Sequence, residues 1–262
     1  MLADGIARLT IPEGEIFALT DGAGTFGPDV FPTVSDEARA DLLARAGETE
    51  VRTEFNAYLL RLHGQPLTLV DTGCGTLFGP GCGRVPGLLA ALGVQPGDIG
   101  RIIFTHLHRD HVGGAVYADG LAYPNAEIVL SQAEAEFWQG KDATAGEFLA
   151  QVAPRTVTDG QEIAPGVTAW MLPGHTPGHM GLRIGQVAFV GDILHSVAMQ
   201  AAAPETCTKF DSDPQIAIAS RRAALSLAAA QDLTVIGSHF LAPMKFAKAS
   251  GQGDGYALVP VA

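Results

Sequence analysis

The chain has 262 residues, and its 28 acidic against 16 basic side chains give a formal net charge of −12. This charge argues against a nucleic-acid groove and against a basic surface that binds membranes. No apolar run reaches the length of a transmembrane helix, and the opening residues lack the basic-then-apolar pattern of a signal peptide. We therefore expect a cytoplasmic protein with neither a nucleic acid nor a membrane as partner.

The first part of the chain alternates strand-like and helix-like segments. Apolar, β-branched or alternating runs predict strands over residues 15–19, 55–62, 67–71 and 101–105. Ser35 is a good helix N-cap and predicts a helix from residue 36, and the run 85–92 predicts a second helix.

The second part continues in the same style. It predicts a helix over residues 132–139 and strands over 127–131, 168–172, 181–184, 186–190 and 234–237. Asp213 as N-cap and Pro214 in the first turn predict a long helix before the last of these strands. The alternation predicts an α/β fold with sheets packed between layers of helices. We expect a single domain over residues 1–262, made of two pseudo-repeated halves that meet near residue 160.

The stretch FTHLHRDHVGGA, residues 104–115, places three histidines and one aspartate within six positions. His106 and His108 alternate in an extended segment and can point the same way, and Asp110 and His111 follow directly. Imidazole and carboxylate groups are ligands for zinc, iron, manganese and cobalt. One metal rarely needs four ligands from six residues, so this spacing favours two adjacent metals.

Three more candidate ligands follow apolar strands elsewhere. His175 follows the predicted strand 168–172, Asp192 follows 186–190, and His239 follows 234–237. Functional sites of open α/β sheets lie where strands end, so these side chains and the histidine-rich stretch predict one shared site. The other interpretations are a turn residue for His175, a helix N-cap for Asp192 and a core histidine for His239.

At this point the sequence resembles a known family. THLHRDHVGG is similar to the HxHxDH string of the metallo-β-lactamase superfamily, and the three later side chains match its remaining ligands in order. Residues 70–80, 121–138, 210–214 and 255–261 resemble the methyl parathion hydrolase-like and lactonase-like branch. The resemblance covers nearly the whole chain. It implies a four-layer αββα sandwich of two mixed sheets flanked by helices, and a homodimer.

The resemblance also implies how the seven side chains divide between two divalent metal ions. By this resemblance, His106, His108 and His175 hold the first metal, and Asp110, His111 and His239 hold the second. Asp192 bridges both metals. Zinc is the first expectation, and iron, manganese or cobalt would suit the same ligands.

Two metals about 3.5–4 Å apart can ionise a shared water, which predicts a bridging hydroxide that attacks an electrophilic centre. Asp110 or Asp192 would carry a proton to the leaving group. Two roles stay open for His195: it contacts the substrate or donates a proton, or it has a local structural role. Asp71 either accepts a hydrogen bond from a ligand imidazole or ends its strand as a turn residue.

The predicted substrate is a small, uncharged or weakly polar lactone or ester, with an organophosphate triester as a further option. Phe78, Trp138 and Phe148 are candidates for an apolar pocket wall, and core packing is the alternative for Phe78 and Trp138. The alternative function is an iron-dependent redox enzyme that resembles persulfide dioxygenases, which use essentially one iron. A metal-binding protein without catalysis is a third interpretation.

Overall fold

The computed structural model describes residues 2–117, 120–141 and 143–261. Its strands form two seven-stranded sheets and one short two-stranded ribbon. The first sheet has the order β1–β2–β3–β4–β5–β8–β9. Its strands are β1 Ile6–Ile11, β2 Gly14–Phe26, β3 Val51–Leu62, β4 Leu67–Val70, β5 Ile99–Ile103, β8 Glu127–Ser131 and β9 Arg155–Val157.

The second sheet has the order β10–β11–β12–β13–β14–β15–β16. Its strands are β10 Glu162–Ala164, β11 Val167–Met171, β12 Met180–Ile184, β13 Val187–Phe189, β14 Thr234–Ile236, β15 Ala247–Gln252 and β16 Gly255–Pro260. Both sheets are mixed, because β4, β5, β8 and β9 run parallel in the first and β13 and β14 run parallel in the second. The ribbon pairs β6 Val116–Tyr117 with β7 Gly120–Leu121.

The helices begin where capping chemistry predicts. The Ser35 side chain accepts from the amide of Ala38, and the Asp213 side chain accepts from that of Ile216. The α-helices are α1 Asp36–Arg45, α2 Val85–Ala91, α3 Arg109–Val112, α4 Gln132–Trp138, α5 Ala143–Leu149, α6 Val197–Gln200 and α7 Pro214–Ala230. Short 3₁₀ segments are η1 Pro28–Val30, η2 Pro96–Asp98 and η3 Gly191–Ile193.

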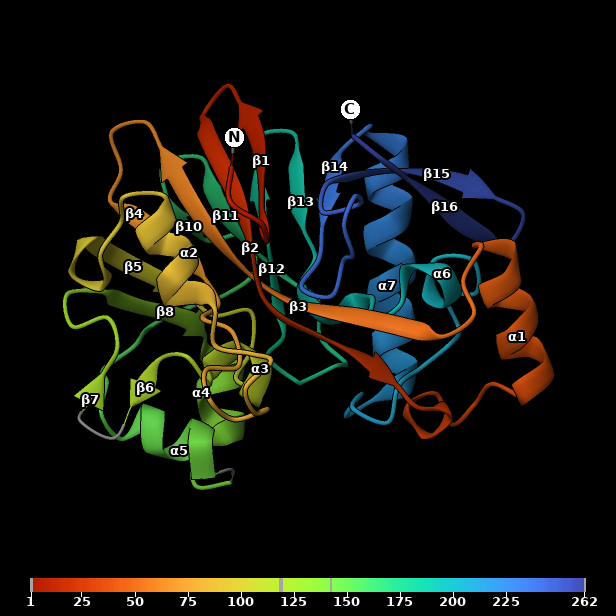
Figure 1. Ribbon diagram of the computed structural model, residues 1–262, viewed down its shortest axis with the longest axis horizontal. Helices are drawn as coiled ribbons and strands as arrows, with labels where there is room; N and C mark the ends of the chain where they lie inside the picture. Colours follow the sequence, from red (N-terminus) through yellow and green to blue (C-terminus); the bar gives the residue numbers. More distant parts are fainter. Residues whose placement is uncertain (1, 118–119, 142, 262) are drawn as a thin grey trace.

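Three buried clusters fill the spaces between four layers. In β2, Ile16 packs toward the second sheet, while the next residue, Phe17, packs toward α2 and α5, as the alternation of a strand requires. A third cluster joins the second sheet to Leu225 of α7. Figure 1 shows α2, α4 and α5 beside strands of the first sheet on the left, and α7 beside strands of the second sheet on the right, with α1 and α6 next to it. The expected αββα sandwich is therefore confirmed.

Strands β2 and β3 are longer than their sequence pattern predicts. The ladder between β2 and β3 continues past an irregularity at Thr20–Gly22 as far as Phe26 and Val51. Glycines and polar residues hide this extension from a search for alternating apolar residues. The pattern also missed β1, the β15–β16 hairpin, α5 and α6. The change from one sheet to the other falls between Val157 and Glu162. The division into two pseudo-repeated halves stays a prediction.

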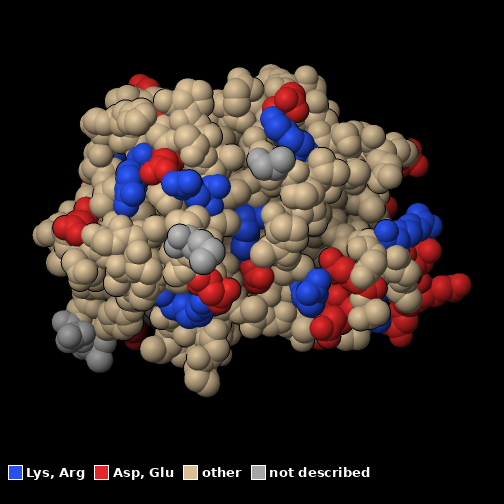
Figure 2. Space-filling view, turned by 45° about the horizontal axis from the view of Figure 1, so that its top comes forward, with Lys and Arg blue, Asp and Glu red and all other residues tan. Residues whose placement is uncertain are grey.

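The surface carries both signs of charge. Figure 2 shows Lys and Arg side chains interspersed with acidic ones on the visible face, and acidic side chains gather at its right-hand edge. Figure 1 places α1 on that side, where Asp36, Glu37 and Asp41 are exposed. Within the described ranges, no helix combines the length and the apolar character needed to cross a membrane.

Candidate metal centre

The histidine-rich stretch begins where strand β5 ends. After Ile103 the chain has no regular secondary structure until α3 begins at Arg109, so His106 and His108 lie on the segment that enters the helix. Asp110 and His111 lie within α3 itself. Gly113 follows, and a Cβ atom there would lie 2.3 Å from the carbonyl oxygen of Cys74. Glycine is therefore needed for α3 to approach the 71–84 loop this closely.

The second sheet delivers the other three predicted ligands. His175 lies in the turn after β11, Asp192 in η3 after β13, and His239 in the loop after β14. Because β13 and β14 are parallel neighbours, the side chains that follow them emerge at the same sheet edge. The structure brings together all the side chains that the sequence analysis assigned to one site: His106, His108, Asp110, His111, His175, Asp192 and His239.

Their donor atoms form two groups. In the first group, Nδ1 of His108 lies 2.9 Å from Nε2 of His106 and 2.9 Å from Nε2 of His175. The second group consists of Asp110, His111, Asp192 and His239, and its donor atoms all lie within 4.8 Å of one another. These groups match the division between two metals that the resemblance implies.

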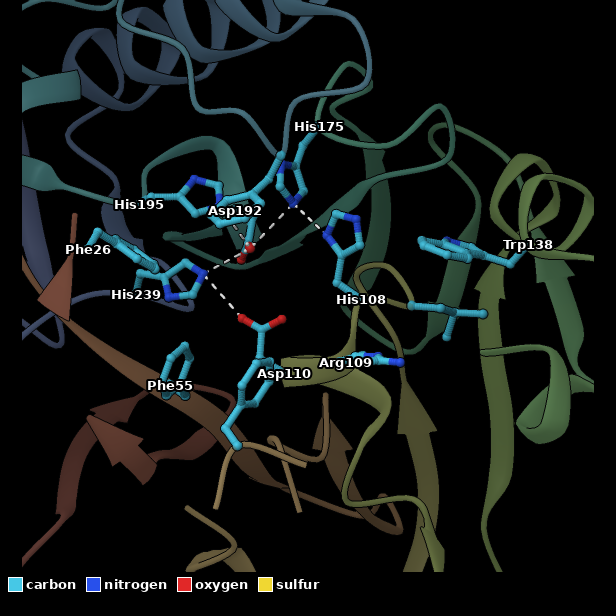
Figure 3. Close-up of a pocket in the computed structure, with 13 residues that line it drawn as sticks. Phe26, Phe55, His108, Arg109, Asp110, Trp138, His175, Asp192, His195 and His239 are labelled. Atoms are coloured by element: carbon cyan, nitrogen blue, oxygen red, sulfur yellow. Dashed lines mark hydrogen bonds and ion pairs between the residues drawn. The ribbon is translucent and has the colours of Figure 1, made fainter. Parts of the chain in front are cut away.

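Asp192 lies between the two groups. Its Oδ2 is 3.0 Å from Nε2 of His239 and 3.2 Å from Nε2 of His111 in the second group. The same oxygen is 3.5 Å from Nε2 of His175 and 3.8 Å from Nε2 of His106 in the first. Figure 3 shows Asp192 between His175 and His239, with Asp110 opposite. One carboxylate thus faces both groups.

Hydrogen bonds on the outside of the cluster orient three of the imidazoles. Nδ1 of His111 lies 2.8 Å from Oδ2 of Asp71, and Nδ1 of His175 lies 3.0 Å from Oδ1 of Asp211. Nδ1 of His239 lies 3.2 Å from the carbonyl oxygen of Glu54. Because a carboxylate or a carbonyl can only accept, each Nδ1 donates its proton outward. The Nε2 atom of a neutral ring then directs a lone pair into the cluster.

The charges of the cluster favour a cation. Burial lowers the pKa of His106 well below its ordinary value and the pKa of His108 to about 3. Burial alone would raise the pKa of Asp110, but His111 and His239 outweigh it and lower that pKa to about 2. Burial would likewise lower the pKa of His111, but Asp192, Asp110 and Asp71 raise it well above its ordinary value. Two carboxylates therefore stay ionised among buried imidazoles.

The donor set fits divalent metal ions. With the Nδ1 protons directed outward, Nε2 of His111 and Nε2 of His239 meet Oδ2 of Asp192 at 3.2 and 3.0 Å, so a positive charge, either a proton or a metal cation, must lie between these atoms. The buried Oδ1 of Asp192 has no hydrogen-bond partner among the residues that the structure describes. Mixed nitrogen and oxygen ligands suit zinc, iron, manganese and cobalt. The side chains could thus hold two cations that share Asp192.

Comparison with known proteins identifies the family. A family model described as the Metallo-beta-lactamase superfamily matches residues 55–239, more than half of the chain. The chain belongs to the metallo-beta-lactamase superfamily. The resemblance found in the HxHxDH string is therefore confirmed.

Among the relatives of this superfamily member are an N-acyl homoserine lactonase of Bacillus sp, 36% identical over 102 residues, and the human Metallo-beta-lactamase domain-containing protein 1, 34% identical over 134 residues. These matches cover 38% and 50% of the chain, and they span only 39% and 41% of the relatives' lengths.

Solved structures match the whole fold. The structure of AidC, a dizinc quorum-quenching lactonase, has a TM-score of 0.91 at 24% identity, over 99% of both chains. The structure of the hydrolase AbOPH in the beta lactamase superfamily has a TM-score of 0.88 at 27% identity, over 100% of this chain and 99% of that one.

In this superfamily member an aromatic pocket opens beside the candidate metal centre. The cavity has a volume of about 280 Å³, and Phe78 and Trp138 line it as the sequence predicted. Trp138 meets His108 edge to face, with 5.4 Å between the ring centroids, so the pocket wall touches a predicted ligand. Phe78 stacks on Phe55 at 5.7 Å and is half exposed, which places it at the mouth.

The prediction for Phe148 was wrong. Its side chain is fully buried on α5, where it packs edge to face against Phe104 with 5.1 Å between the ring centroids. It belongs to the cluster between the first sheet and its helices and is not among the residues that line the cavity. The sequence could not reveal this, because an aromatic residue on an amphipathic helix can serve a core or a pocket equally well.

Other pocket residues were missed. Phe26 and Phe55 reach the cavity from the extended ends of β2 and β3, and Phe210 reaches it from the loop before α7. Phe210 lies in the FDSDP stretch of the resemblance, which was the one available signal. The next residue, Asp211, was also missed, although it is the partner of His175.

His195 lines the same pocket and lies close to the cluster. Its Nε2 is 3.4 Å from Oδ2 of Asp192, and its ring stacks on that of His239 with 4.7 Å between the centroids. Burial lowers the pKa of His195 well below its ordinary value, so the ring is neutral. Its Nδ1 is buried, with no hydrogen-bond partner in the part of the chain that the structure describes.

Asp71 supports the cluster from behind. The fully buried carboxylate accepts from the amide and the hydroxyl of Thr105, at 2.9 and 2.8 Å, in addition to His111. Its backbone has a φ of 59°, a conformation that aspartate and asparagine tolerate better than most residues. Of the two interpretations open for Asp71, this position favours the hydrogen bond to a ligand imidazole.

Proposed function

We propose that this chain is a dinuclear metal-dependent hydrolase that opens lactones or cleaves esters. The observation that carries the proposal is the pair of donor groups with Asp192 between them, beside an aromatic pocket. Two divalent cations held there would supply an ionised water and polarise the substrate carbonyl. His106, His108 and His175 would hold one cation, Asp110, His111 and His239 the other, and Asp192 would contact both.

Asp110 is the better candidate for moving the proton to the leaving group. Both carboxylates line the cavity, but the side chain of Asp110 is 17% exposed, whereas that of Asp192 is 2% exposed and lies among imidazoles. A group that exchanges a proton with the substrate must reach it, and Asp110 meets this condition. We assign the proton transfer to Asp110 and the joint support of both cations to Asp192.

His195 is proposed to contact the substrate. It is a neutral imidazole at the wall of the cavity, and its unpartnered Nδ1 leaves a hydrogen-bonding capacity unused. That nitrogen is itself buried, so the contact would come from the part of the ring that lines the cavity. His195 would therefore orient the lactone or ester carbonyl.

The cavity favours small substrates with apolar substituents. Four aromatic side chains, Phe26, Phe55, Trp138 and Phe210, surround it, and Phe78 extends its apolar surface to solvent. N-acyl homoserine lactones, named in the relatives of Bacillus, combine an ester carbonyl with an apolar acyl chain, and we propose them as the first substrates to test. Aryl esters and organophosphate triesters follow.

The experiment combines elemental analysis of the purified chain with a panel of lactones, aryl esters and organophosphates. We expect about two equivalents of metal, with zinc first, and turnover of a lactone or ester. A chain that takes up no more than one metal would contradict the dinuclear centre. Oxygen consumption with a persulfide would instead support the iron-dependent alternative, which the complete second group of donors does not favour. A cytoplasmic location and a homodimer stay predictions, and light scattering tests the second.

A further inference from the structure

A buried carboxylate on α4 lies directly behind the first group of donors. Glu134 is fully buried and accepts three hydrogen bonds, two from loops elsewhere in the chain and one from Trp138 on the same helix. Its Oε1 accepts from the amide of Leu107 at 2.9 Å and from Nε1 of Trp138 at 2.5 Å. Its Oε2 accepts from the hydroxyl of Thr176 at 2.6 Å.

These three partners connect Glu134 to every imidazole of the first group. Leu107 is the residue between His106 and His108, and Thr176 directly follows His175. Trp138 meets the ring of His108 edge to face and lines the pocket. A single side chain therefore holds two ligand-bearing loops, one from each sheet, together with one wall of the cavity.

The start of α4 is itself fastened to the loop that carries His175. The hydroxyl of Ser131 donates to the carbonyl oxygen of Gly178 at 2.6 Å and accepts from the amide of Glu134 at 3.1 Å. A Cβ atom on Gly178 would lie 2.1 Å from the backbone nitrogen of Glu134, so the two segments are in direct contact. The position of Glu134 relative to His175 is thus set by packing as well as by hydrogen bonds.

An ionisable group is expensive to bury, and this cost needs a compensating role. Two residues further along the same helix, Glu136 is exposed, and its carboxylate accepts from the side chain of Gln132 at 2.9 Å. Both glutamates lie on α4, but only Glu134 contacts the loops that carry the predicted metal ligands. Glu136 is therefore a matched control.

We propose that Glu134 is a positioning residue that couples occupation of the first donor group to the orientation of Trp138 in the pocket wall. This inference rests on the proposed function. Because the coupling is reciprocal, metal bound by His106, His108 and His175 would hold the indole in place, and a misplaced indole would weaken metal binding. Removing a hydrogen bond to a ligating side chain costs about 10- to 100-fold in metal affinity, and we expect the same range for Glu134, which holds the segments that carry the ligands.

Tryptophan emission tests the coupling without an activity assay. The chain has two tryptophans, Trp138 and Trp170, so the variant Trp170→Phe leaves one reporter. Zn²⁺ is titrated into this metal-free background in competition with a chelator. We expect emission to change as metal binds. In the Trp170→Phe background, we expect the Glu134→Ala variant to lose the emission change and to bind Zn²⁺ at the first donor group about 10- to 100-fold more weakly. We expect the Glu136→Ala variant to match the Trp170→Phe protein in both properties.

Two further variants keep the test decisive if Glu134→Ala does not fold. Glu134→Gln retains an oxygen for Leu107 and Trp138, and its amide can donate to the Thr176 hydroxyl, so we expect it to restore most of the affinity and the emission change. Thr176→Val removes one hydrogen bond and is expected to weaken the first equivalent less than Glu134→Ala does. If the Glu134→Ala variant folds, an unchanged affinity for Zn²⁺ and an unchanged emission would overturn the positioning role. If only the Thr176→Val variant folds, the same result in that variant would overturn it. A background protein that binds no Zn²⁺ would instead overturn the proposed function.

Discussion

Replacing Asp71 by asparagine tests whether hydrogen bonds outside the cluster prepare it for metal. The substitution keeps the size of the side chain, and asparagine tolerates the φ of 59° at this position. Backbone strain is therefore not expected to contribute. What changes is the acceptor that faces Nδ1 of His111 at 2.8 Å.

The magnitude follows from the partners of the carboxylate. Asparagine can still accept from the Thr105 amide, but its NH₂ group would then face the Thr105 hydroxyl and Nδ1 of His111. The hydroxyl can rotate and accept, whereas the imidazole can avoid the clash only by moving its proton to Nε2. That proton would occupy the lone pair that faces Asp192. We expect affinity for the second metal to fall about 10- to 100-fold, or about 1.4–2.7 kcal/mol.

The assay is competition with a chelator at constant pH, followed by elemental analysis after gel filtration. Asp41→Asn is the control, because it removes the same charge from an exposed ion pair with Arg45 on α1. The first metal should be retained in both variants. Affinities of the Asp71→Asn protein within twofold of those of the control would refute the role of Asp71.

Three further predictions concern the centre, the pocket and stability. Asp192→Ala should lower metal content and abolish turnover, because it removes the carboxylate between the two groups; elemental analysis and rates check this, and an active variant with two metals would contradict it. His195→Phe should reduce lactone turnover with metal content intact, and an unchanged rate would leave the residue a structural role only. For pH, burial lowers the pKa of His179 to about 4 from 6.5. The unfolded chain then binds more protons between these values, so the metal-free protein should lose up to about 3 kcal/mol of unfolding free energy as pH falls from 6.5 to 4. Denaturant titrations should show that the free energy of unfolding depends less steeply on pH in the metal-free His179→Gln variant than in the unaltered protein. Equal slopes in the two proteins would refute this.

The predicted ligands were visible in the sequence because metal chemistry restricts residue type and position. Few side chains other than His, Cys, Asp and Glu hold a divalent cation, and four candidates occur within the single stretch 106–111. His175, Asp192 and His239 were recognisable because each follows an apolar strand. Helix starts at Ser35 and Asp213 were equally readable, since capping is a local interaction.

The residues that line the pocket and the buried carboxylates behind the candidate metal centre could be identified only from the tertiary structure. Phe148 and Trp138 are similar in sequence context, yet packing buries one against Phe104 and turns the other toward His108. The sequence alone determined which side chains could bind metal, because that property belongs to the individual residue. Only the fold decided which aromatic residue faces the cavity and which buried carboxylate, such as Glu134, braces it, because burial and hydrogen-bond partners arise from segments far apart in the chain.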